Sequence, residues 1–298
     1  MRRVPLLLAV LPLAAQVRPE LAKLFEYDAA APLAAEETPV DARDGWRMRA
    51  VKFAGPRGGQ ATGLLVIPDG KGPFAGIIWT HSQGPSNFLP DALLLARAGA
   101  LSLLLDLPAS SEQMSPEMEK AVVNIRRAAD LLAARGDVDP KRLAYAGHSY
   151  GAMMGAVVAG VDKRFKCFVF EVGLLGMSIH LSTSPHPWAK GVRESMTKEK
   201  FEALMERIRP YDAGPYIAHA APAALLFQSA RFDEGVPEKD AQDFFDRASQ
   251  PKEMKWYDTG HEANDISVVV DRARFLGKTL ALLSLETVIR KKLGLSAR

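Results

Sequence analysis

Residues 143–155 read LAYAGHSYGAMMG, an apolar run followed by a serine between two glycines and then a run of small residues. The run before the serine predicts a buried strand, and the run after it predicts a helix. A turn from strand into helix that exposes a serine strains its backbone and leaves no room for neighbouring side chains. Gly147, Gly151 and Gly155 meet that requirement. The pattern G-x-S-x-G in this setting indicates a nucleophile elbow at Ser149, the alternative being an ordinary helix cap with glycine packing.

Short apolar runs alternate with helical segments on both sides of this stretch. The runs lack in–out alternation, as is typical of parallel strands covered by helices on both faces. The clearest helix covers 115–135, with Ser115 as its cap and Gly136 at its end. An antiparallel hairpin is predicted over 49–68, and a short strand over 255–257 precedes the last helix. The sequence therefore predicts an α/β fold, a mostly parallel twisted sheet of about eight strands with helices on both faces. The predicted buried strands are 74–80, 100–108, 142–148, 166–172 and 222–230.

The N-terminus has the features of a secretory signal. Arg2 and Arg3 precede an apolar run over 4–13, and Ala14 and Ala15 supply small residues for cleavage. We therefore expect a signal peptide over 1–15 and export to the periplasm or medium, the alternative being an N-terminal helix packed on the body. The run is shorter than the ~20 residues of a membrane-spanning helix, so no stable membrane insertion is expected.

Two segments follow the signal, and the second of them contains a distinct insertion. Residues 16–45 are expected to form an N-terminal arm, irregular over 24–44, and residues 46–298 a single catalytic-type domain. Residues 173–220 are longer than a simple crossover requires, and we expect a small cap there that includes a helix over 198–209. One crossover helix with a long surface loop is the alternative.

Composition excludes several classes of partner. The chain has 298 residues, with 38 basic and 35 acidic side chains, and no block of Lys and Arg. Binding of nucleic acid or of an anionic membrane is therefore not expected. The single cysteine, Cys167, lies in an apolar run and is expected to be a buried strand thiol. A lone cysteine provides neither an internal disulfide nor a cysteine-rich metal site.

A serine hydroxyl needs a base that is oriented by an acid. Of the six histidines, His261 lies in a glycine-containing loop late in the chain, after a short strand and before the last helix. Asp233 follows a buried strand, where catalytic groups collect in parallel sheets. Glu234 and Asp258 are the rival acids. The order Ser149, Asp233, His261 is that of an α/β-hydrolase triad.

An oxyanion hole needs backbone N–H donors beside the serine. The N–H of Tyr150, directly after Ser149, is the first predicted donor. The second is expected in the loop after the strand over 74–80, where we assign Gln83, with Ser82 as the next choice.

Four blocks of sequence together resemble the α/β-hydrolase superfamily, and within it the bacterial dienelactone-hydrolase-like and acetyl-xylan-esterase-like serine hydrolases. The resemblance implies a Ser–Asp–His triad and neither a metal nor an organic cofactor. Dienelactone hydrolases have a cysteine nucleophile where this chain has Ser149, and many relatives have His-Gly where it has His81-Ser82. The blocks are GLLVIPDGKGPFAGIIWTH (63–81), DVDPKRLAYAGHSYGAMMGA (137–156), AAPAALLFQSARFDEGVP (220–237) and YDTGHEAN (257–264).

These observations predict an exported serine hydrolase that cleaves a small-molecule carboxylic ester through an acyl-enzyme. His81, Ser82 and Trp188 are expected to contact the substrate, and two further histidines of the 173–220 segment, His180 and His186, are candidates for the pocket lining. Two histidines without a paired acid do not predict a metal site. A serine peptidase of the prolyl-oligopeptidase type is the second hypothesis, ranked lower because about 45 residues before the first strand are too few for a propeller. A non-catalytic binding protein with the same fold is the third.

Overall fold

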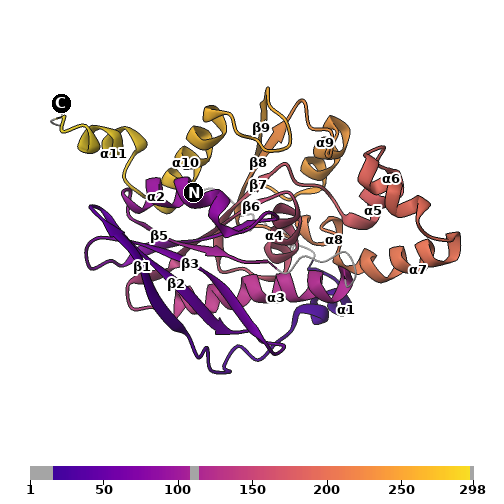
Figure 1. Cartoon of the computed structure of the whole chain (residues 1–298), viewed down its shortest axis with the longest axis horizontal. Helices are drawn as coiled ribbons and strands as arrows, with labels where there is room; N and C mark the ends of the chain where they lie inside the picture. Colours follow the sequence, from indigo (N-terminus) through magenta and orange to yellow (C-terminus); the bar gives the residue numbers. More distant parts are fainter. Residues whose placement is uncertain (1–15, 108–113, 296–298) are drawn as a thin grey trace, which may run out of the picture.

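The computed structural model describes residues 16–107 and 114–295, in which a twisted sheet lies between two layers of helices (Figure 1). The predicted signal peptide lies outside the described residues. Within them the sheet has nine strands in the order β1-β2-β3-β5-β4-β6-β7-β8-β9. The strands are β1 (Glu36–Arg43), β2 (Trp46–Ala54), β3 (Gln60–Pro68), β4 (Phe74–His81), β5 (Ala100–Leu105), β6 (Val138–His148), β7 (Phe165–Glu171), β8 (Ala224–Ala230) and β9 (Lys252–Tyr257).

The direction of the strands confirms the predicted α/β fold. β2 and β3 form the expected antiparallel hairpin, and β3 pairs antiparallel with β5. From β5 to β9 every neighbouring pair is parallel. β4 is buried along its whole length because it pairs on both sides and is covered on both faces. The carboxyl ends of the parallel strands therefore lie at one edge of the sheet, and the loops that follow them meet there.

The helices divide between the two faces of the sheet. The packing of each layer buries its own apolar cluster against the strands, which accounts for the unbroken apolar runs in the sequence. One face carries η2 (Pro85–Phe88), α2 (Leu89–Ala96), α10 (Ile266–Leu280) and α11 (Leu285–Lys292). The other carries α1 (Pro19–Ala22), η1 (Lys23–Phe25), α3 (Met114–Ala133), α4 (Tyr150–Val161), α8 (Gly214–Ile217) and α9 (Glu238–Arg247).

Strand β1 is the main departure from the predicted fold. The sequence predicts an irregular arm over 24–44, but Glu36–Arg43 pairs antiparallel with β2 at the edge of the sheet. Most of its side chains are exposed, so the strand has no apolar alternation to mark it. Cross-strand ion pairs join it to β2, Glu36 with Lys52 at 2.8 Å and Glu37 with Arg49 at 2.9 Å. Backbone pairing and cross-strand ion pairs, rather than burial of apolar side chains, hold this strand in the sheet.

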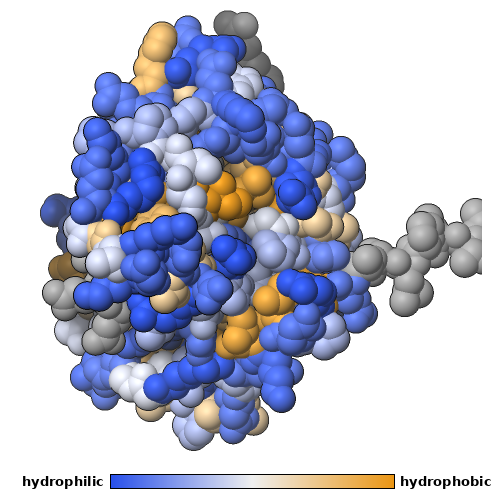
Figure 2. Space-filling view, turned by 90° about the vertical axis from the view of Figure 1, so that its right-hand side faces the viewer, coloured by the Kyte–Doolittle hydropathy of each residue, from blue (hydrophilic) through white to orange (hydrophobic). Residues whose placement is uncertain are grey.

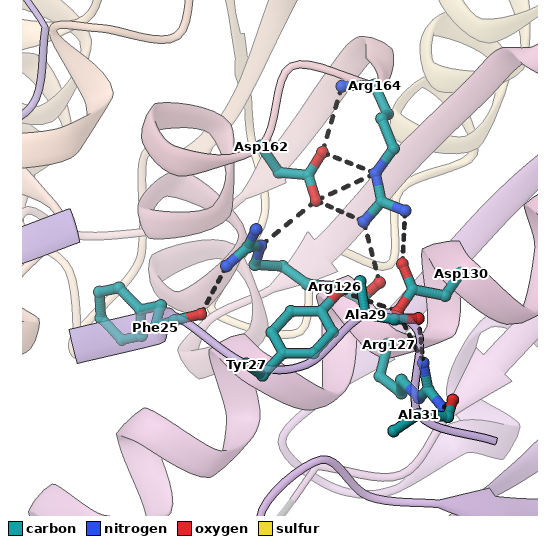
Figure 3. A network of polar contacts seen from close by, with 9 residues as sticks. All are labelled: Phe25, Tyr27, Ala29, Ala31, Arg126, Arg127, Asp130, Asp162 and Arg164. Carbon is teal, nitrogen blue, oxygen red and sulfur yellow. Dashed lines mark hydrogen bonds and ion pairs between the residues drawn. The ribbon is translucent and has the colours of Figure 1, made fainter. Parts of the chain in front are cut away.

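The segment before β1 is held against the body by arginines (Figure 3). Arg127 of α3 is buried and donates hydrogen bonds to the carbonyl oxygens of Ala29 and Ala31. Arg126 donates to the carbonyl oxygen of Phe25 at 2.5 Å, and the hydroxyl of Tyr27 donates to Asp130 at 2.9 Å. The bonds from the two arginines satisfy carbonyl oxygens that have no partner within a helix or strand. They therefore hold an irregular segment in place.

The 173–220 segment forms several short helices, of which α5 (Met177–Thr183), α6 (Pro187–Glu194) and α7 (Lys198–Ile208) project beyond the sheet at the right of Figure 1. The observed α7 agrees with the helix predicted over 198–209. Leu181 and Ala189 are fully buried and belong to the same apolar cluster as the helices of that face. The segment is therefore packed onto the body rather than a loose surface loop. Its helices are α5 (Met177–Thr183), α6 (Pro187–Glu194), α7 (Lys198–Ile208), η3 (Arg209–Tyr211) and α8.

Among the helices of 16–107 and 114–295, none combines the length and apolar character that crossing a membrane requires.

Candidate active site

The elbow predicted from the sequence has the expected geometry. β6 ends at His148, α4 begins at Tyr150, and Ser149 between them has a φ of 53°. A Cβ on Gly147 would lie 2.5 Å from the carbonyl carbon of Gly151, so glycine is required where strand and helix approach. The backbone N–H of Ser149 donates to the carbonyl oxygen of Glu171 at the end of β7, at 2.9 Å. The strained serine is thus held by the neighbouring strand.

The structure brings the three predicted triad residues together in one chain of hydrogen bonds. His261 Nε2 lies 3.0 Å from Ser149 Oγ, and His261 Nδ1 lies 2.8 Å from Asp233 Oδ2. Asp233 follows β8 and His261 follows β9, so all three residues stand at carboxyl ends of parallel strands. The arrangement is the one in which a histidine accepts a serine proton while a carboxylate holds the ring.

The rival acids take other positions. Glu234 lines the cavity beside Ser149. Asp258 forms an exposed ion pair with Arg231 at 3.3 Å. The carboxylate that the imidazole of His261 contacts is therefore that of Asp233, whose side chain is 1% exposed.

The acid also sets the proton affinity of the base. Burial lowers the pKa of His261, but the hydrogen bond with Asp233 and its negative charge raise it more, so the pKa lies above its ordinary value of 6.5. Burial lowers the pKa of His81 and of His180. Of these three histidines, His261 is thus the one that gains a proton most readily, as suits a general base.

The backbone N–H groups of the two predicted oxyanion donors differ in their partners. Tyr150 is the first residue of α4, so its N–H belongs to the unpaired first turn that suits an anion. Gln83 follows β4, and its N–H donates to Nδ1 of His81 at 3.1 Å. Its side-chain amide donates to Glu262, next to the base, at 3.3 Å. The side chain of Gln83 therefore connects the loop that follows β4 with the loop that carries His261.

A cavity of about 490 Å³ opens beside Ser149 and is bounded by the 173–220 segment. Trp188 lines it, as predicted, and so do His180 and His186. Six lining residues that the sequence did not indicate lie next to predicted features. Two are inside the 173–220 segment, Leu174 and Met177, and four are close in sequence to Asp233 or His261, namely Phe232, Gly235, Val236 and Gly260. The lining consists of Ser149, Leu174, Met177, His180, His186, Trp188, Phe232, Glu234, Gly235, Val236, Gly260 and His261.

The other two predicted substrate contacts lie outside this cavity. His81 is 7% exposed, and its ring packs against that of His148. Ser82 is exposed on the loop that follows β4. Nδ1 of His81 accepts the N–H of Gln83, two residues later in the chain. His81 and Ser82 are not among the lining residues of this cavity, and their contact with a substrate stays a prediction.

The rim of the cavity carries exposed apolar side chains. Trp188 is 43% exposed and Phe232 is 68% exposed. The side of the molecule shown in Figure 2 is mostly hydrophilic, with its hydrophobic residues gathered in small groups. In the described part of the chain, histidines, cysteines and acids do not come together in groups of three that could hold a metal ion.

Comparisons with known proteins give the family of the chain and its fold. A model of the prolyl oligopeptidase family matches residues 119–272, more than half of the chain, including Ser149, Asp233 and His261. A comparison with curated proteins gave no match.

Solved structures give the fold. Acetyl xylan esterase 1 from Thermoanaerobacterium sp. JW/SL YS485 is 15% identical, with a TM-score of 0.73 over 87% of this chain and 92% of that one. An acetyl xylan esterase from Paenibacillus sp. R4 is 19% identical, with a TM-score of 0.70 over 89% of this chain and 92% of that one. A prolyl endopeptidase is 19% identical, with a TM-score of 0.61 over 80% of this chain and 39% of that one. The chain therefore belongs to the prolyl oligopeptidase family, and it is an enzyme of the serine-hydrolase type with the α/β-hydrolase fold.

Proposed function

We propose that the protein hydrolyses carboxylic esters of small molecules through an acyl-enzyme on Ser149. The observation that carries the proposal is the hydrogen-bond chain from Asp233 through His261 to Ser149, with distances of 2.8 and 3.0 Å. A serine hydroxyl becomes a useful nucleophile when a base within hydrogen-bond reach removes its proton.

In the proposed mechanism, Ser149 Oγ attacks the ester carbonyl while His261 Nε2 takes the serine proton. Asp233 stabilises the charged imidazole that results. The oxyanion is held by the backbone N–H of Tyr150, and the proposed second donor, the N–H of Gln83, is kept in the oxyanion loop by its bond to Nδ1 of His81 until the oxyanion forms. His261 then protonates the leaving alkoxide, and water repeats the sequence on the acyl-enzyme.

The cavity supports a small, partly apolar substrate. Its volume of about 490 Å³ suits one small molecule, and Leu174, Met177 and Val236 offer apolar contacts for an acyl or alcohol group. Trp188 closes the side formed by the cap segment. An ester is favoured over an amide because an alkoxide is the better leaving group, whereas the nitrogen of an amide must be protonated before it can leave.

Family membership favours a second candidate, a peptidase that cleaves after proline. The family match covers Ser149, Asp233 and His261, and a triad does not itself distinguish an ester from an amide. A third possibility, a binding protein that retains the fold, requires a serine that does not react. Turnover of prolyl peptide substrates distinguishes the peptidase from the esterase. Labelling with a serine-reactive probe distinguishes the binding protein from both enzymes.

Labelling with a fluorophosphonate and turnover of short p-nitrophenyl esters test the proposal. We expect modification at Ser149, and loss of both labelling and turnover in the variants S149A and H261A. S195A, which removes an exposed serine of the cap segment, is the matched control and should behave as the wild type. Faster cleavage of prolyl peptides than of every ester would favour the peptidase. A folded wild-type protein that neither labels nor turns over any substrate would overturn the hydrolase.

Export is part of the same proposal and rests on the sequence of residues 1–15. N-terminal sequencing of protein recovered from the periplasm or medium should begin at Gln16. Retention of the intact N-terminus inside the cell would contradict it.

A further inference from the structure

Two buried histidines lie side by side under the active site. His81 ends β4 and His148 ends β6, and the two residues are partners in the parallel ladder between these strands. Their rings stack with centroids 4.0 Å apart and planes inclined by 9°. His148 is 1% exposed. Each ring stands at the start of a loop that carries part of the proposed machinery.

The contact of His148 with the base loop is direct. Its Nε2 lies 2.8 Å from the backbone carbonyl oxygen of His261. A carbonyl oxygen only accepts hydrogen bonds, so Nε2 of His148 carries the proton. Nδ1 of the same ring is buried without a partner. The ring is therefore neutral, with one N–H committed to the backbone of the base.

His81 makes the corresponding contact with the oxyanion loop. Its Nδ1 accepts the N–H of Gln83 at 3.1 Å, so this ring also has its proton on Nε2. Burial lowers the pKa of His148 to about 3 and also lowers the pKa of His81. Two neutral rings stack without charge repulsion, and neither competes with His261 for the serine proton.

The pair packs against an aromatic ring that is itself in contact with a buried arginine. The ring of Phe88 meets the edge of His81 with centroids 5.6 Å apart, and the guanidinium of Arg272 lies 5.0 Å from the centre of the Phe88 ring. Arg272 is buried and ion-paired with Asp91 at 2.9 Å and with Glu171 at 2.7 Å. Because the carbonyl of Glu171 also binds the N–H of Ser149, the serine and the histidine pair share one support.

We propose that the stacked pair His81–His148 positions the base loop and the oxyanion loop relative to Ser149, with the N–H of His148 holding the carbonyl of His261. The inference rests on the proposed function. His148 acts through His261 and does not itself contact the reacting atoms, so it is a positioning residue. Its loss allows the His261 backbone to move, and a shift of about 1 Å at a catalytic group can cost about 100-fold in rate.

The test compares two replacements of His148. H148F keeps a planar ring for stacking but removes the N–H, whereas H148Q keeps a neutral N–H at a similar reach from the backbone. H219F and H219Q change a histidine of the α8–β8 connection and serve as matched controls. For each protein, kcat and KM on p-nitrophenyl esters, the rate of fluorophosphonate labelling and the melting temperature are measured.

We expect H148F to lower kcat and the labelling rate by about 10- to 100-fold with KM within about twofold. H148Q should recover most of that loss. A purely structural role would lower the melting temperature of both variants without separating kcat in this way. Wild-type rates in H148F, or an equal loss in H148Q and H148F, would overturn the inference.

A second measurement does not depend on activity. The ¹⁵N NMR signals of the His148 ring in the wild-type protein should be those of the neutral tautomer with its proton on Nε2. The opposite tautomer, or a charged ring at neutral pH, would overturn the inference even if H148F loses activity. If the wild-type protein itself neither labels nor turns over a substrate, the proposed function fails and the positioning role falls with it.

Discussion

Asp233 accepts the Nδ1–H of His261 on one carboxylate oxygen, Oδ2, at 2.8 Å, while its other oxygen is already occupied. Oδ1 accepts the backbone N–H groups of Gly235 and Val236, both at 2.8 Å. The two backbone bonds fix the plane of the carboxylate and thus the direction in which Oδ2 faces. This geometry determines what an amide would do at the same position.

We expect D233N to lower kcat by about 10³- to 10⁴-fold. The backbone N–H groups retain the oxygen of the asparagine, so its NH₂ group faces Nδ1 of His261. The ring must then present a lone pair at Nδ1 and carry its proton on Nε2, the atom that has to accept from Ser149. Ester turnover and the melting temperature check the prediction. D258N, at an exposed rival acid, should retain wild-type turnover, and a similar loss in both variants would refute the assignment.

The pH dependence follows from the pKa of the same histidine. Burial lowers the pKa of His261, but Asp233 raises it more, so the base becomes protonated at a pH above 6.5. Only the neutral ring accepts the serine proton, so kcat/KM should fall as the pH decreases through that value. A pH profile of ester turnover should therefore reach half of its maximum above pH 6.5. A midpoint at or below 6.5 in the wild-type protein would contradict this prediction.

The elbow makes a prediction about stability. A Cβ on Gly155 of α4 would overlap the ring of Tyr145, which is fully buried and donates through its hydroxyl to the carbonyl of Gly151 at 2.7 Å. We expect G155A to lower the free energy of unfolding by about 1–3 kcal/mol, the usual cost of overpacking.

The matched control is G277A in α10, where no atom lies within 4 Å of the added Cβ. Alanine there should raise the free energy of unfolding by about 0.5–1 kcal/mol because glycine is costly inside a helix. Urea denaturation measures both variants. Equal effects of the two replacements would mean that contact with Tyr145 does not require glycine in α4.

Some features could be predicted from the sequence because they depend on local chemistry. The elbow at Ser149 follows from glycine spacing, and the positions of Asp233 and His261 follow from strand ends. Strand β1 could not be predicted, since its exposed polar residues have no hydrophobic period and its partner is chosen by the sheet.

The inward position of His81 is another feature outside the reach of sequence patterns. It depends on register, because β4 and β6 bring His81 and His148 together from positions 67 residues apart. The buried position of Arg272 could not be predicted for the same reason. Its partners Asp91 and Glu171 come from distant segments, so nothing in the local sequence indicates that a charge on α10 is buried.

The buried position of Arg272 leads to a prediction about the stability of the protein. Arg272 is 3% exposed and neutralises Asp91 and Glu171, which are nearly as buried. R272M keeps an unbranched apolar stem, shorter than that of arginine, but leaves both carboxylates without a cation. Because removing one partner strands a buried charge, we expect the free energy of unfolding to fall by about 3–5 kcal/mol at pH 8. R274A breaks the exposed pair with Glu286 at 3.3 Å and should cost no more than about 1 kcal/mol.

Acid should partly rescue R272M. Burial raises the pKa of Glu171 even with Arg272 present, and loss of the cation raises it further. The folded variant then binds more protons than the unfolded chain, so its stability increases as the pH falls. Urea denaturation at pH 5 and pH 8 should show a smaller deficit relative to the wild type at pH 5. An equal deficit at both values would mean that lost packing, rather than an unpaired charge under the elbow, destabilises the variant.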